Sequence, residues 1–122
     1  MISLSKLNNL IVDKDPLSYS LIECLLYYDG PMLSIVKDSD GKTFIYLCLD
    51  IEDNQIRFCY ISITDDTLSD LIGGRITLRN MIFNSEQIFL FDLIGDNQST
   101  CYLLTDSDLF PQEYLPDEDA YL

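Results

Sequence analysis

Residues 43–62 read TFIYLCLDIEDNQIRFCYIS, two runs rich in β-branched and aromatic side chains on either side of Asp53-Asn54. Such runs favour strands, and the Asp-Asn pair favours a tight turn because Asn tolerates a positive φ and Asp bonds the local backbone. Similar runs precede them, separated by glycine-containing turns: CLLYY at 24–28, MLSIV at 32–36, and turns at Asp29-Gly30-Pro31 and Asp38-Ser39-Asp40-Gly41. Because short connections favour pairing of neighbouring strands, residues 18–64 predict an antiparallel meander.

The segments on both sides of the meander carry helix signals. Leucines at 4, 7 and 10 recur at helical spacing, which predicts a short helix that ends near Asp15-Pro16. Thr64 and Thr77 stand where an N-cap residue would begin helices over 65–72 and 78–83. Each hydroxyl is expected to accept a hydrogen bond from a free backbone N–H of the first turn.

Two more strands are predicted near the end of the chain, at 87–94 and 100–104, around the turn Gly95-Asp96-Asn97. The strands are joined by hairpins and the helices are segregated from them, so we expect an α+β fold, an antiparallel sheet of about six strands with short helices packed on one face. At this length, we expect residues 1–122 to form a single domain with a core of its own, with 106–122 as an acidic C-terminal segment.

Two of the predicted strands lack the alternation of apolar and polar residues that is typical of a sheet with one solvent-exposed face. Residues 44–49 are all apolar, and 88–94 are interrupted only by Asp92. Both faces of these strands are therefore expected to be covered. Two interpretations remain open. The strands are either covered within the fold, as a central strand between two helices or in a small barrel, or they form a surface for self-association or for a partner.

Composition excludes several functions. The 122 residues hold 21 acidic and 7 basic side chains, for a net charge of -14, and no histidine. Direct binding to nucleic acid needs Lys and Arg at phosphates, and the commonest general base and mixed zinc sites need histidine. No glycine-rich phosphate loop or calcium loop is complete. We expect a protein that is not an enzyme and carries no cofactor or metal.

The expected compartment is the cytoplasm. The N-terminal residues lack the apolar run of a signal peptide, and no run is long enough to span a membrane. Each of the four cysteines lies in an apolar run and none forms a CxxC pair, so all four are expected to be reduced, buried thiols. These are Cys24, Cys48, Cys59 and Cys101.

The clearest functional signal is the distribution of charge. Residues 80–122 hold nine acids and no base, whereas 1–79 hold all seven bases and twelve acids. Near the end, acids alternate with aromatic and aliphatic residues, a pattern suited to docking on a basic groove. The alternative is a solvated tail whose apolar side chains pack back on the domain. The predicted partner-binding residues are Asp106, Asp108, Glu113, Tyr114, Leu115, Asp117, Glu118, Asp119 and Tyr121.

Four blocks resemble a family of small bacterial domains of unknown function. They are Tyr28-Asp29-Gly30-Pro31-Met32-Leu33, Lys37 to Tyr46 (KDSDGKTFIY), Gly74 to Arg79 (GRITLR) and Tyr114-Leu115-Pro116-Asp117-Glu118. The resemblance implies a cytosolic protein of a bacterium or prophage, and it supplies no catalytic motif.

Three hypotheses follow from these observations. The first is a non-catalytic acidic inhibitor or immunity protein, in the extreme a nucleic-acid mimic, that masks a basic and nucleic-acid-handling surface on a partner protein. The second is a structural or regulatory subunit, with a homodimer formed through 44–49 and 88–94. The third, a hydrolase with two facing carboxylates, ranks last because no local pattern distinguishes any one acid.

Overall fold

A computed structural model describes residues 1–27, 31–96 and 98–122. Outside the described residues lie Tyr28 of the expected strand 24–28, Asp29 and Gly30 of the expected first turn, and Asn97 of the expected turn at 95–97. The strands are β1 (Ile11–Val12), β2 (Ser20–Tyr27), β3 (Pro31–Lys37), β4 (Thr43–Glu52), β5 (Gln55–Ser62), β6 (Ile88–Ile94) and β7 (Gln98–Leu104). The α-helices are α1 (Asp65–Ile72) and α2 (Leu78–Asn84), and four short 3-10 helices are η1 (Ser5–Leu10), η2 (Pro16–Ser18), η3 (Ser107–Leu109) and η4 (Gln112–Tyr114).

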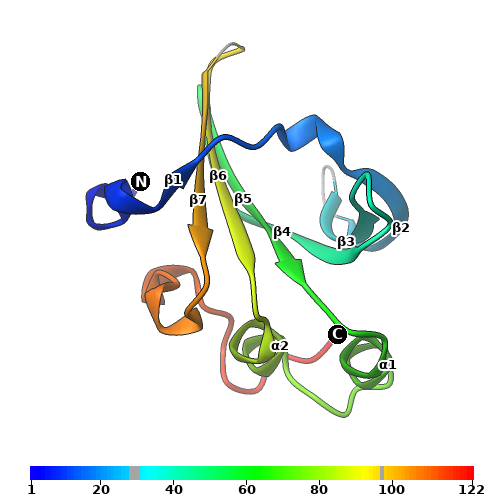
Figure 1. Cartoon of the computed structure of the whole chain (residues 1–122). Coiled ribbons are helices and arrows are strands. Elements are labelled where there is room, and N and C mark those ends of the chain that lie inside the picture. Colours follow the sequence, from blue (N-terminus) through cyan, green and yellow to red (C-terminus); the bar gives the residue numbers. More distant parts are fainter. Residues whose placement is uncertain (28–30, 97) are drawn as a thin grey trace.

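The strands form one antiparallel sheet in the order β1-β7-β6-β5-β4-β3-β2, as Figure 1 shows. The meander from β2 to β5 and the hairpin of β6 and β7 were both expected. The seventh strand, β1, was not. Its two residues, Ile11 and Val12, pair with Tyr102 and Cys101 of β7. A two-residue strand is too short to carry a readable pattern, and the preceding helix is a 3-10 helix that ends at Leu10, before Asp15.

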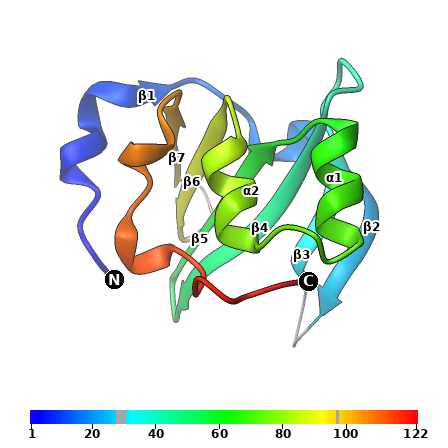
Figure 2. The same cartoon turned by 90° about the horizontal axis from the view of Figure 1, so that it is seen from below.

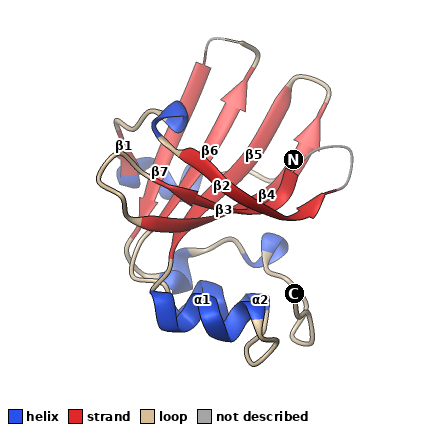
Figure 3. Cartoon of the chain, turned by 90° about the vertical axis from the view of Figure 1, so that its right-hand side faces the viewer, coloured by secondary structure: helices blue, strands red, loops and turns tan. Residues whose placement is uncertain are grey.

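The sheet is strongly coiled. Figure 3 shows β2 and β3 at a large angle to β5, β6 and β7. The ten-residue strand β4 pairs with β3 through its first half, and its pairing with β5 shifts register between Cys48 and Asp50. A bulge of this kind bends a strand and increases its twist. The coil brings β2 and β3 round toward one face of the sheet.

A first core lies between the sheet and the helices. Leu71 of α1, Met81 and Ile82 of α2 and residues of every long strand except β2 have buried side chains in this cluster. Figure 2 shows α1, α2 and the C-terminal segment crossing the strands on the side toward the viewer. Leu4, the N-cap residue of η1, and Leu7 of η1 also belong to this cluster, and η1 lies against β7.

A second core, rich in aromatic rings, lies on the opposite face. It holds Val36, Phe44, Phe58, Tyr60, Phe89, Phe91 and Cys101. Tyr19, in the segment that links β1 to β2, stacks on Tyr60 with ring centroids 3.7 Å apart and meets the edge of Phe44. The ammonium of Lys14 lies 5.0 Å from the centroid of Phe89 and 5.4 Å from that of Tyr19. The linking segment therefore helps to cover this face.

Two cores explain the unbroken apolar runs. On β5, Cys59 and Ile61 belong to the first core, whereas Phe58 and Tyr60 belong to the second. Successive side chains of a strand point to opposite faces, so an apolar residue is needed at every position when neither face is wet. The runs 44–49 and 88–94 are thus parts of the internal strands β4 and β6.

Both predicted N-caps are present. The Thr64 hydroxyl accepts a hydrogen bond from the N–H of Thr67 at 3.2 Å, and that of Thr77 accepts from Asn80 at 3.1 Å. Capping by threonine stabilises a helix by about 1 kcal/mol. Gly73 ends α1, and Gly74, with φ of 71°, makes the left-handed turn after it.

The cysteines are free thiols in different environments. Cys59 and Cys101 are buried as expected, and burial raises the pKa of Cys101 to about 12. Cys48 is half-buried. Cys24 is exposed, so the expectation of a buried side chain was wrong there: it lies on β2, at the edge of the sheet, where no further strand or helix packs against it among the described residues.

Candidate functional site

The C-terminal acidic segment, residues 106–122, follows an ordered path over the body of the protein. The Asp106 carboxylate caps η3 by accepting a hydrogen bond from the N–H of Asp108 at 2.9 Å. Phe110, between η3 and η4, is buried in the first core. The segment is thus attached at its beginning by a cap and by an apolar anchor.

The far end of the segment is held by α2. Arg79 Nε donates to the carbonyl of Pro116 at 2.9 Å, and the N–H of Leu78 donates to the carbonyl of Ala120 at 2.9 Å. In Figure 2 this end, coloured red, runs past α2 toward α1. The first turn of a helix has N–H groups without partners inside the helix, and the carbonyl of Ala120 satisfies one of them.

The nine predicted partner-binding residues divide into two groups. The six carboxylates and Tyr121 are exposed: Asp106, Asp108, Glu113, Asp117, Glu118, Asp119 and Tyr121. Tyr114 and Leu115 are half-buried and pack against the first core. One ion pair to these carboxylates is present in the described part of the chain, between Arg79 Nη1 and Glu118 at 3.5 Å, with Glu118 still 83% exposed.

Tyr114 is anchored by a buried arginine. Arg57 of β5 is 5% exposed, and its Nη1 donates to the Tyr114 hydroxyl at 2.9 Å and to the carbonyl of Ile2. The Tyr114 hydroxyl in turn donates to Asp50 Oδ2 at 3.1 Å. Burial raises the pKa of Tyr114 against the opposing effect of Arg57, so the hydroxyl stays protonated and can act as this donor.

Arg57 forms an ion pair with Asp92, its cross-strand neighbour on β6, with Nε 3.2 Å from Oδ1. Gln55 donates to the same carboxylate oxygen at 2.7 Å. Burial alone would lower the pKa of Arg57, but the hydrogen bonds to Asp92 and Tyr114 outweigh it and the pKa is raised. This cluster, Asp50, Arg57, Asp92 and Tyr114, is here called the arginine cluster. It links β4, β5, β6, the N-terminus and the C-terminal segment.

The arginine cluster was missed from the sequence, although a signal was present. Arg57 and Asp92 are each a charged residue within a strand that is otherwise mostly apolar. A charged side chain in such a strand needs a partner of opposite sign, because an unpaired buried charge is costly. The register that makes the two residues neighbours cannot be read from either strand alone.

A groove lies between the N-terminal residues and the beginning of the C-terminal segment, with a volume of 440 Å³. Buried Leu4, Leu7 and Phe110 contribute an apolar part of its lining. Exposed Asp108 and Glu113 also line it, together with one exposed cation, Lys6, so two predicted partner-binding carboxylates lie beside apolar surface. This arrangement could receive an apolar side chain that is flanked by cationic groups.

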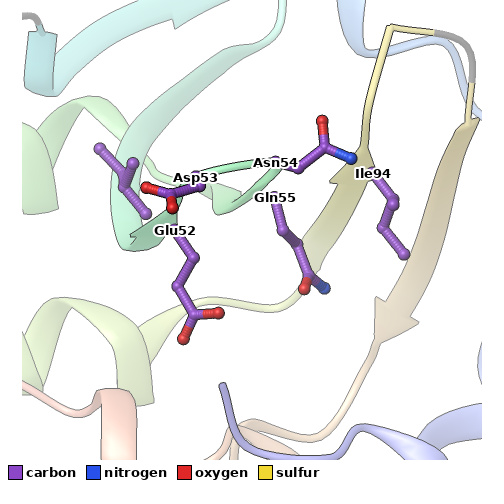
Figure 4. A pocket seen from close by; sticks show the side chains of 6 residues that line it. Glu52, Asp53, Asn54, Gln55 and Ile94 are labelled. Atoms are coloured by element: carbon purple, nitrogen blue, oxygen red, sulfur yellow. The ribbon is translucent and has the colours of Figure 1, made fainter.

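A second, shallower hollow lies at the turn between β4 and β5 and has a volume of 540 Å³. In Figure 4, Glu52 and Gln55 extend on one side of this turn, whereas Asn54 points toward the end of β6, where Ile94 lies. Glu52 forms an ion pair with the N-terminus, because its Oε1 lies 2.8 Å from the amino group of Met1. No residue of this hollow is a nucleophile paired with a base, so its lining suggests no chemistry.

Neither a metal site nor a membrane span is found within residues 1–27, 31–96 and 98–122. No three His, Cys, Asp or Glu side chains in these ranges are arranged to hold a metal ion. The helices of the same ranges are too short or too polar to cross a bilayer.

Fold and site together define a small acidic α+β domain with a coiled seven-stranded sheet and an ordered acidic C-terminal segment. A family model described as a family of unknown function (DUF6575) matches residues 11–120, and the chain belongs to this family. Nothing similar was found among curated proteins or among solved structures.

Proposed function

We propose that this chain is a non-catalytic acidic protein-binding domain of the inhibitor or immunity type, acting in the cytoplasm of a bacterium. It masks a basic surface on a partner protein that handles nucleic acids, in a conflict system of bacteria or phage. A nucleic-acid mimic is the extreme form of this function. One observation carries the proposal: the six carboxylates of the C-terminal segment are all exposed on a path that is held at both ends.

Preorganisation supports this function. A flexible acidic tail would lose conformational entropy when it docked, whereas a segment already fixed by Phe110, Tyr114 and Arg79 loses less. The charge is also largely unneutralised, because residues 80–122 contain nine acids and no base. Complementary charge of this kind accelerates the encounter with a basic partner and discriminates against acidic ones.

Affinity needs more than charge, and the groove beside η1 supplies apolar surface for it. Exposed charge pairs contribute little, whereas apolar side chains buried at the centre of an interface dominate binding. We therefore expect the partner to place an apolar side chain against Leu4, Leu7 and Phe110, with Lys or Arg nearby for Asp108 and Glu113.

Two variants with the same net charge test the proposal. The first, Glu113→Gln/Asp117→Asn/Asp119→Asn, neutralises exposed carboxylates of the C-terminal segment whose side chains make no hydrogen bond among the described residues. The second, Asp13→Asn/Asp53→Asn/Asp96→Asn, neutralises three exposed carboxylates elsewhere. Partners are captured from a bacterial lysate with the unmodified chain, and the association rate of each purified partner is then measured in a salt series.

The first variant should slow association several-fold at low salt and less at high salt, while the second should have a much smaller effect. The reason is that electrostatic attraction steers the partner toward the place where the carboxylates lie. Salt screens this attraction beyond about 8–10 Å. Equal effects of the two variants, or an association rate that does not change with ionic strength, would show that the C-terminal segment is not part of the recognition surface. A captured partner with an acidic surface would contradict the proposal as a whole.

A second candidate function is a structural or regulatory subunit that self-associates. The surface that favours it is not the expected one at 44–49 and 88–94. The strands β4 and β6 are internal, but β2 is an edge strand on which Leu21, Ile22 and Leu26 are more than half exposed. Exposed apolar edges can add a strand from another chain.

Sedimentation equilibrium at high concentration tests this alternative. A dimer that becomes monomeric in Ile22→Lys but persists in Ile51→Lys would support it, because Ile51 is equally exposed but lies at the far end of β4. A monomer at all concentrations would exclude the homodimer.

A further inference from the structure

A small pocket lies on the face of the second core, away from the C-terminal segment. Its volume is 180 Å³, and the residues that line it come from β2 to β5 and from the segment before β2: Tyr19, Leu21, Ser34, Val36, Tyr46 and Tyr60. Tyr114 and Leu115 of the C-terminal segment pack against the other core. The pocket is thus separate from the surface proposed above.

Most of the lining is aromatic or aliphatic. Tyr19 and Tyr60 are stacked, and the ring of Tyr46 is tilted by 53° to that of Tyr60 with centroids 5.8 Å apart. Leu21, at 62% exposure, stands on the solvent side. An aromatic ligand would gain edge and face contacts with rings that are already fixed in position.

Two hydroxyl groups of the pocket residues lack partners. Ser34 is only 1% exposed, and neither its Oγ nor the buried Oη of Tyr19 has a hydrogen-bond partner in the described part of the chain. The neighbouring hydroxyl of Tyr60, by contrast, donates to the carbonyl of Pro16 at 3.1 Å. Buried polar groups are almost always satisfied, so an orphan hydroxyl in a pocket indicates that something else bonds it.

The pocket is open to solvent on one side, and its volume matches that of a single ring. An apolar cavity of about 150 Å³ holds a benzene molecule. We propose that this pocket binds a small uncharged phenol, a single aromatic ring whose hydroxyl hydrogen-bonds to Ser34. A hydroxyl both donates and accepts, as does that of Ser34, so either direction of the bond is possible. Burial raises the pKa of Tyr60 to about 12, and the same environment disfavours a charged ligand.

The experiment compares two probes that differ by one hydroxyl group, 4-methylphenol and toluene. Both are titrated into the full chain, and binding is followed by NMR shifts of the methyl groups of Leu21 and Val36. Eight heavy atoms can support a dissociation constant of about one millimolar. The phenol should bind about tenfold more tightly than toluene, the contribution of one buried hydrogen bond.

Variants connect this difference to Ser34. Ser34→Ala should abolish the preference for 4-methylphenol, because no hydroxyl is left at that position. Ser39→Ala, on an exposed turn, should keep the preference. Equal binding of the two probes to the unmodified chain, or a preference that survives in Ser34→Ala, would overturn the proposal.

Two further outcomes would also overturn it. If neither probe shifts Leu21 and Val36, the hydroxyl of Ser34 is satisfied by water and the pocket holds no aromatic ligand. If N-acetyltyrosinamide binds more tightly than 4-methylphenol, the occupant is a tyrosine of another polypeptide and not a free small molecule.

Discussion

Arg57 on β5 donates a hydrogen bond of 2.9 Å to the hydroxyl of Tyr114, a residue 57 positions further along the chain. The same hydroxyl donates to Asp50. The sequence predicted Tyr114 to be a partner-binding residue in a surface segment, but Tyr114 is a structural part of the domain. Its ring holds the C-terminal segment, and with it the neighbouring carboxylates, against the sheet. The consequence can be measured as stability.

Tyr114→Phe should lower the free energy of unfolding by about 1–3 kcal/mol, because Arg57 and Asp50 each lose a partner at a part-buried site. Urea unfolding gives the value. Hydrogen exchange should also become faster for the amides of residues 112–120. Tyr121→Phe is the control: Tyr121 is 56% exposed, and its substitution should change stability by less than about 0.5 kcal/mol. Equal effects would show that Tyr114 is not an anchor.

Arg57→Met should destabilise the protein by about 3–5 kcal/mol, since it leaves the carboxylate of Asp92 without its ion pair at a site that is 11% exposed. The double variant Arg57→Met/Asp92→Leu should recover part of the loss, because no unpaired charge remains. Arg75→Met breaks the exposed pair with Asp70 and should cost about 1 kcal/mol or less. A double variant less stable than Arg57→Met would contradict this account.

Ser34→Ala should raise the free energy of unfolding of the ligand-free protein by about 1 kcal/mol, because it removes an unsatisfied buried hydroxyl. Ser62→Ala should do the opposite, since the Ser62 hydroxyl bonds Ser85 and accepts from the N–H of Gln87. Thermal unfolding of both variants measures the difference. A loss of stability in Ser34→Ala would mean that water already satisfies the hydroxyl.

Stability should fall as the pH rises from about 9 to about 12. Burial raises the pKa of Cys101 from 9.0 to about 12 and the pKa of Tyr60 from 10.0 to about 12. Between these values the unfolded chain has lost protons that the folded chain keeps, so higher pH favours unfolding. Urea unfolding at several pH values gives the slope, and Cys101→Val should reduce it. An unchanged slope in this variant would assign the effect to other groups.

The local features of this fold could be predicted from the sequence. Thr64 and Thr77 were recognised as caps because a cap depends on residues within one helical turn. The β4–β5 turn at Asp53-Asn54 was recognised for the same reason. The strand β1 was missed because it exists only through its pairing with β7, from the other end of the chain.

The exposed carboxylates of the candidate site could be predicted from the sequence, but the contacts that hold the segment against the domain could not. The carboxylates of 106–119 are exposed, as charged groups usually are. The inward position of Tyr114 depends on Arg57, and that of Leu115 on the first core, and both are set by tertiary contacts. The unpaired hydroxyl of Ser34 could not be foreseen either, since it depends on which rings the coil of the sheet brings together.

The pairing of β1 with β7 also affects folding during synthesis. Ile11 leaves the ribosome long before its partner Tyr102 does. The strands from β2 to β6 can pair with their neighbours as they emerge, but β1 gains its strand partner only when β7 is complete. Until then the β6 edge of the nascent sheet stays open and can pair with another chain.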